Sequence, residues 1–196
     1  MSFKYARVIS AILSYPVIGM AEMIFLCYVN GVDLITSFLG VLLHSFGPII
    51  APIIYGKTVR KGDFFVSKRP HRPLLFIPGM LSYIIALHLF YSLDFREIAS
   101  LEFVSISISI ILALITLAWK ISIHMASIAI PIIFFPLLGY VEVLAFSPLL
   151  FIVGWARLKV KAHNLAQVLG GALVGFIPTF LILLFLKSIG YVRLIV

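Results

Sequence analysis

The segment LAQVLGGALVGFIPTFLILLFL, residues 165–186, decides the fold. It is long enough to cross about 30 Å of hydrocarbon as a helix that rises about 1.5 Å per residue. The rest of the chain shares this character, because 63% of its 196 residues are hydrophobic, only 11% are charged and the mean hydropathy is +1.20. The sequence therefore predicts an all-α, polytopic transmembrane helix bundle that forms a single membrane domain over residues 1–196.

Further apolar runs extend the prediction to six to seven spans. The seven candidates are residues 8–29, 34–55, 74–93, 102–119, 121–139, 143–158 and 165–186. Prolines 131, 136 and 148 interrupt the region 120–158, so a re-entrant or tilted segment remains open there. The first run is too long for a cleaved signal peptide and is expected to remain as a helix.

Basic residues concentrate on one predicted face of the membrane. Seven alternating spans place the N-terminus and residues 56–73, 119–124 and 157–163 together, and this face receives twelve of the 15 Lys and Arg. The positive-inside rule makes it cytoplasmic, in a plasma or inner membrane. Such a field suits an anionic lipid headgroup. Nucleic-acid binding is not indicated, because the charge forms a stripe at a membrane face.

The first of three polar clusters on this face is the loop of residues 57–73. It contains Lys61, Lys68, Arg69 and Arg72, and both Arg69 and Arg72 are followed by proline. Guanidinium groups match phosphate oxygens bidentately, and proline stiffens the chain around them. A plain basic cytoplasmic loop is the alternative interpretation.

The second and third clusters border later apolar runs. The second is Lys120, Ser122 and His124, whose imidazole could protonate a departing alkoxide while Ser122 binds phosphate oxygens. The third holds Arg157, then His163 six residues later and Gln167 four further on.

If residues 163–167 are helical, Gln167 can accept a hydrogen bond from one nitrogen of His163 and leave the other to attack phosphorus. Each cluster alone could be an interfacial basic patch. The coincidence of the three on one face favours a phosphate site.

In order and content, the clusters resemble the signatures of the phosphatidic acid phosphatase type 2 superfamily, the integral-membrane lipid phosphatases whose core is shared with vanadium haloperoxidases. Arg157 and His163 match the third signature in spacing, Ser122 and His124 match the second, and Arg69-Pro or Arg72-Pro matches the first. The resemblance implies two leading helices over 1–56, a catalytic-like core over 57–175 and the end of the last helix with a tail over 176–196.

The resemblance also implies roles for these residues. His163 would be the nucleophile that becomes phosphohistidine, and His124 the general acid. Lys61 or Lys68, Arg69, Arg72, Lys120, Ser122 and Arg157 would hold the phosphate. The implied activity is hydrolysis of a lipid phosphate or polyprenyl diphosphate, without metal or cofactor, with membrane lipids as the surroundings.

One departure from the family pattern bears on activity, because Gln167 stands where the third signature has Asp. An amide orients the imidazole but cannot neutralise its charge, and such a swap can cost about 10⁴ in rate. We therefore expect a slow enzyme, or one in which Asp63 supplies the missing charge. The alternative is a family member with little or no turnover that acts as a lipid-headgroup binder, transporter or assembly partner.

Other polar residues inside the apolar runs have simpler interpretations. Glu22 is costly in lipid and is a functional candidate, or is protonated or faces the bundle. His44 and His88 are expected to be hydrogen-bonded packing residues, and no residue grouping has metal-ligand spacing. Gly171 and Gly175 form a small-xxx-small pattern that predicts close helix packing.

Overall fold

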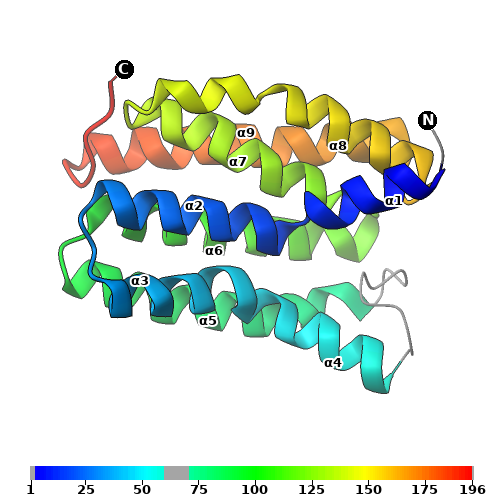
Figure 1. Cartoon of the computed structure of the whole chain (residues 1–196), viewed down its shortest axis with the longest axis horizontal. Helices are drawn as coiled ribbons and strands as arrows, with labels where there is room; N and C mark the ends of the chain where they lie inside the picture. The colour runs from blue at the N-terminus through cyan, green and yellow to red at the C-terminus, as the bar shows by residue number, and fades with distance from the viewer. Residues whose placement is uncertain (1–2, 60–70, 196) are drawn as a thin grey trace. The chain divides into compact units, whose positions relative to one another are not determined.

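The computed structural model describes residues 3–59 and 71–195, which form helices and turns without a strand, as predicted. In chain order the elements are α1 (Phe3–Ile12), α2 (Tyr15–Val29), α3 (Leu34–Val41), the π-helical turn η1 (Leu42–Phe46), the 3₁₀ turn η2 (Gly47–Ile49), α4 (Ile50–Thr58), α5 (Arg72–Ser92), α6 (Arg96–Ala118), α7 (Ile123–Leu137), the 3₁₀ segment η4 (Val141–Phe146), α8 (Pro148–Lys159) and α9 (Leu165–Ser188). Figure 1 shows their course along the chain.

Within the described ranges, six helical stretches are long and apolar enough to cross a membrane. They are Phe3–Val29, Leu34–Thr58, Pro73–Ser92, Arg96–Ala118, Val141–Lys159 and Leu165–Ser188. The chain is therefore an integral membrane protein, as its hydropathy predicted.

Two of the differences from the predicted boundaries have a clear physical cause. The fourth span begins at Arg96 instead of Glu102, because charged residues at an interfacial helix end continue the helix. The sixth is longer than expected, because η4 precedes α8. Pro148 begins α8, a position where its missing N–H costs no hydrogen bond.

The predicted fifth span, residues 121–139, forms the shorter helix α7 of 15 residues, or about 22 Å. Two backbone hydrogen bonds nevertheless show how far it reaches. At its start the Ser122 N–H donates to the carbonyl of Gln167 on α9, and at its end Leu137 accepts from Ile195 in the tail after α9. The region of α7 therefore runs alongside α9 from the first turn of α9 to the tail that follows it.

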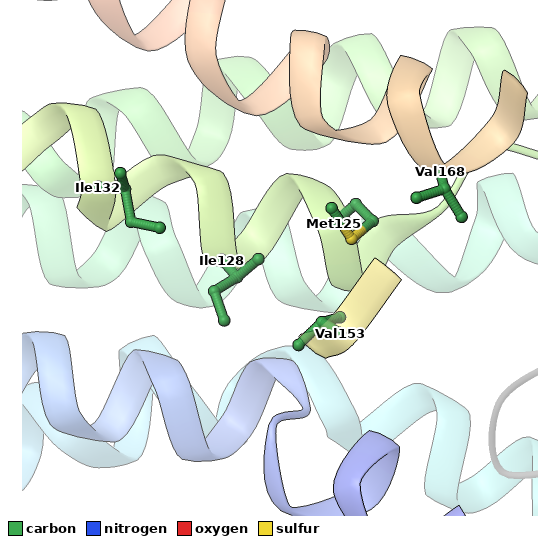
Figure 2. Close-up of a cluster of buried hydrophobic side chains, with 5 residues drawn as sticks. All are labelled: Met125, Ile128, Ile132, Val153 and Val168. Atoms are coloured by element: carbon green, nitrogen blue, oxygen red, sulfur yellow. The ribbon is translucent and has the colours of Figure 1, made fainter. Parts of the chain in front are cut away.

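The chain divides into two compact units, residues 1–18 with 121–196 and residues 19–120. In the first unit, α7, α8 and α9 pack around Met125, Ile128, Ile132, Val153 and Val168. Figure 2 shows three of these side chains along α7, with Val153 coming from α8 and Val168 from α9. Burying large apolar side chains relative to water contributes about 1.5–3 kcal/mol each in a soluble protein. Within a bilayer, close packing replaces that driving force.

Glycines allow the close packing of α7 on α9. A Cβ on Gly175 would lie 2.5 Å from the Ala126 carbonyl oxygen, and one on Gly171 would meet the Ser122 carbonyl oxygen. The predicted small-xxx-small contact is thus confirmed. It places the first turn of α9 directly against the start of α7.

In the unit of residues 19–120, α5 and α6 pack along each other. The span Leu34–Thr58 changes helix type at its centre, from α3 through η1 and η2 to α4. Pro48 has no N–H for the carbonyl of residue 44, which explains why a regular α-helix cannot continue. The N–H of Gly47 donates instead to the carbonyl of Leu42, five residues back.

Candidate functional site

Five of the predicted site residues lie in the first unit, on three helix ends. Ser122 and His124 lie at the start of α7, Arg157 lies in the last turn of α8, and His163 and Gln167 lie on either side of the start of α9. Figure 1 shows that the start of α7, the end of α8 and the start of α9 lie at the same end of this unit, together with α1. These helix ends lie together because α8 runs in the opposite direction to α7 and α9.

The turn from α8 to α9 determines the path of the backbone from Arg157 to His163. The N–H of Ala162 donates to the carbonyl of Arg157, and the N–H of Lys161 donates to the carbonyl of Leu158. Lys161 has a φ of 54°, in the left-handed region that usually requires glycine. This is the Schellman arrangement, and it satisfies the carbonyls at the end of α8.

A capping box begins α9 immediately after this turn. The side chain of Asn164 accepts from the N–H of Gln167 at 2.9 Å, and the Asn164 N–H donates to Gln167 Oε1 at 3.3 Å. The Schellman turn therefore fixes the backbone that follows Arg157, and the capping box fixes the backbone that follows His163.

His163 makes the hydrogen bond that the sequence predicted. Its Nδ1 lies 3.1 Å from Gln167 Oε1. Since this oxygen also accepts from the Asn164 N–H, Nδ1 is the donor, and in the neutral ring the lone pair then lies on Nε2. The expected helix over 163–167 is wrong in one respect, because α9 begins at Leu165 and His163 precedes the N-cap. The hydrogen bond forms because the capping box directs Gln167 back toward residues 163 and 164.

Ser122 connects the second cluster, which contains it, to the third cluster, which contains Gln167. Its backbone N–H donates to the carbonyl of Gln167 at 3.2 Å, and its side chain is fully buried. Its hydroxyl has no hydrogen-bond partner among the residues that the structure describes. A buried hydroxyl of this kind is costly unless another group binds it. His124 follows within the first turn of α7 and is partly buried.

Arg157 is buried, with 7% of its surface exposed, and its Nη1 donates to the Ser10 hydroxyl at 2.6 Å. Ser10 lies on α1 with Ala6 on the same buried face. Ser10 was not among the predicted site residues, and its only signal in the sequence is a hydroxyl four residues from a small residue in an apolar helix. The guanidinium is thereby oriented by a residue from the start of the chain.

The remaining predicted ligands lie either outside the described residues or in the other unit. Lys61, Lys68 and Arg69, together with Asp63, lie outside the described residues. Arg72 begins α5 and Lys120 follows α6, both in the unit of residues 19–120. The contribution of these basic residues to a phosphate site stays a prediction.

A second polar group, which the sequence analysis did not recognise as one, lies inside the unit of residues 19–120. His44 is fully buried and its Nδ1 lies 2.9 Å from Glu102 Oε1, while its Nε2 lies 3.4 Å from Glu22 Oε2. His44 is thus a hydrogen-bonded, buried residue, as expected, whereas His88 is exposed on α5, so the packing prediction for it is wrong. Among the described residues, no group of three or more His, Cys, Asp or Glu could hold a metal ion.

No protein-family model, no curated protein and no solved structure matches this chain. The resemblance to lipid phosphatases therefore rests on the residues and their spacing.

Proposed function

We propose that this protein is a metal-independent phosphatase that hydrolyses a lipid phosphate or polyprenyl diphosphate through a phosphohistidine intermediate at the membrane interface. The observation that carries the proposal is the meeting of the second and third clusters, where the Ser122 N–H bonds to Gln167 and Gln167 bonds to His163. Two motifs separated by some forty residues thus converge on one end of one unit.

The proposed mechanism uses the tautomer that this geometry favours. His163 Nε2 attacks phosphorus in line, the bond from phosphorus to the lipid oxygen breaks, and His124 donates a proton to the leaving oxygen. Water then attacks the phosphohistidine and releases phosphate. Ser122 and Arg157 would bind the phosphate oxygens, since both are polar groups buried at this end of the unit.

We also propose which end of this unit faces the cytoplasm. The basic residues Lys4, Arg7, Lys159 and Lys161 are exposed at the end of the unit that carries the site. By the positive-inside rule this end, with the N-terminus, faces the cytoplasm. An anionic headgroup would be attracted to it.

A second candidate function has its own supporting observation. The Arg157 guanidinium is already engaged by Ser10, and Gln167 serves the cap of α9 without supplying a negative charge. A site of this kind could bind a lipid headgroup without turnover. The second candidate is therefore a catalytically weak or inactive headgroup binder, transporter or assembly partner.

Phosphate release by the purified full-length protein in EDTA separates the two functions. The substrates are phosphatidate, phosphatidylglycerol phosphate and a polyprenyl diphosphate in detergent. We expect release that falls by about 10³-fold or more in His163→Ala, because the nucleophile is lost, and by about 10²-fold in Arg157→Lys. His88→Ala is the matched control, since His88 is an exposed imidazole on α5 outside the site.

The phosphoenzyme provides the second measurement. With radiolabelled substrate and a rapid quench, the wild-type protein should carry acid-labile, base-stable phosphate that is absent from His163→Ala. Turnover that persists in His163→Ala would end the mechanism. Lipid binding without phosphate release would establish the second candidate instead.

A further inference from the structure

The buried group of Glu22, His44 and Glu102 suggests a second site, in the unit of residues 19–120 and independent of the proposed phosphatase. Its members come from three different spans, Phe3–Val29, Leu34–Thr58 and Arg96–Ala118. Side-chain exposures are 6% for Glu22 and 0% for both His44 and Glu102. Ionisable groups in such positions are expensive in a membrane and usually mark ion or proton pathways.

The backbone around His44 is also unusual. His44 and Ser45 lie in the π-helical turn η1, where the N–H of Gly47 donates to the carbonyl of Leu42. Single π turns inside α-helices are rare and occur frequently at functional sites. Because a π turn rotates the residues around it relative to an α-helix, it determines which side of the helix carries His44. Here both ring nitrogens face carboxylate oxygens.

The charges of the three side chains do not balance in their ordinary states. An imidazolium between two carboxylates has a net charge of −1, and burying an uncompensated charge in an apolar interior is strongly unfavourable. One more proton makes the group neutral. It then contains an imidazolium that donates to both neighbours, one carboxylate and one carboxylic acid. The 2.9 Å contact between His44 and Glu102 has the length of a charge-assisted hydrogen bond.

Two oxygens are available for that additional proton. Oε1 of Glu22 and Oε2 of Glu102 are buried and accept no hydrogen bond from the described part of the chain. Among the described residues, titratable side chains near the group include Tyr83 on α5, whose ring centroid lies 5.5 Å from that of His44, and the buried Cys27 on α2. Neither compensates the negative charge.

We propose that Glu22, His44 and Glu102 form an intramembrane proton-binding site that takes up a proton from the aqueous phase and releases it again. A further carboxylate, Glu97, lies in the first turn of α6 and accepts a hydrogen bond from Asn30 at 3.1 Å. Glu97 is partly exposed and lies five residues before Glu102 on α6. It provides the aqueous side from which a proton can enter.

Infrared spectroscopy of the full-length protein in lipid nanodiscs tests this proposal. At neutral pH we expect the C=O stretching band of one protonated carboxyl group, and we expect the band to shift when H₂O is replaced by D₂O. The band should be lost in both Glu22→Gln and Glu102→Gln, because the remaining imidazolium and carboxylate already balance. It should grow about twofold in His44→Gln, because two carboxyl groups must then be neutral.

Glu142→Gln is the control and should keep the band, since Glu142 is an exposed carboxylate in η4 and lies outside the group. The wild-type measurement needs no variant, so the proposal stays testable even where a substitution prevents folding. Absence of the band in the wild-type protein would overturn the proposal, and so would a band that does not shift in D₂O, because a sealed proton cannot be exchanged. Loss of the band on adding NaCl at constant pH, but not choline chloride, would assign the site to a metal cation instead.

Discussion

Gln167 accepts hydrogen bonds through both its side chain and its backbone, and a glutamate at this position could accept the same hydrogen bonds. Its side-chain oxygen accepts from His163 and from the Asn164 N–H, and its backbone carbonyl accepts from Ser122. The amide therefore orients the imidazole and caps α9 at once. In the proposed mechanism it cannot stabilise the positive charge that His163 would acquire as nucleophile and leaving group.

Gln167→Glu should raise phosphate release by at least about tenfold and up to about 10⁴-fold, because glutamate keeps the shape and the capping box while adding the missing charge. The measurement is the turnover of the same lipid phosphates. Ala166→Glu is the matched control, because it adds the same charge to the same turn of α9 at an exposed position. An equal rise in both variants would show a general charge effect and contradict the role given to residue 167.

At the level of elements, the turn between α8 and α9 holds the site together. Its two capping motifs occupy residues 157–162 and 164–167 with His163 between them, and Lys161 adopts a left-handed conformation to close the first motif. A left-handed conformation costs a non-glycine residue about 1–2 kcal/mol. The turn is therefore strained at a position whose side chain is exposed.

Lys161→Gly should stabilise the protein by up to about 1 kcal/mol, because relief of the left-handed strain exceeds the added flexibility of the unfolded chain. Thermal unfolding in detergent should show a midpoint about 2–4 °C higher. Lys159→Gly, an exposed lysine in the last turn of α8, should instead lower the midpoint by a similar amount. Equal effects of the two glycines would contradict the assignment of strain to residue 161.

At the level of the molecule, the number of membrane crossings depends on α7. This helix is shorter than the six long helical stretches, yet its ends contact both the first turn of α9 and the tail beyond α9. The segment of α7 therefore extends from one end to the other of the unit formed by residues 1–18 and 121–196. We therefore expect seven crossings, six by the long helices and one by α7 with its flanking residues.

Cysteines placed at Lys57, Glu142 and Lys159 in a Cys27→Ala background test this expectation, since all three positions are exposed. An impermeant maleimide should modify Lys57→Cys and Lys159→Cys from the cytoplasmic side and Glu142→Cys from the opposite side. Vesicles of both orientations provide the measurement. If α7 did not cross, Lys57→Cys and Lys159→Cys would react from opposite sides.

The local features of the site could be predicted from the sequence, because they depend on short-range geometry. The contact between His163 and Gln167 was predicted from their spacing of four residues, although a capping box and not a helix over 163–167 brings it about, and the close packing of α7 on α9 follows from Gly171 and Gly175. Ser10 could not be found this way, because its contact with Arg157 joins opposite ends of the chain. Glu102 was missed because a charged residue near an apolar run was taken as the edge of the span.

The sequence by itself determined that this is a helical membrane protein, because the bilayer requires long apolar helices and hydropathy reveals them directly. It also determined the order of the polar clusters along the chain. Only the tertiary structure decided which polar groups meet inside the bundle, above all Glu22, His44 and Glu102. The physical reason is that the packing of three spans around His44 and the rotation imposed by a single π turn select these partners, and residue spacing reveals neither for this group.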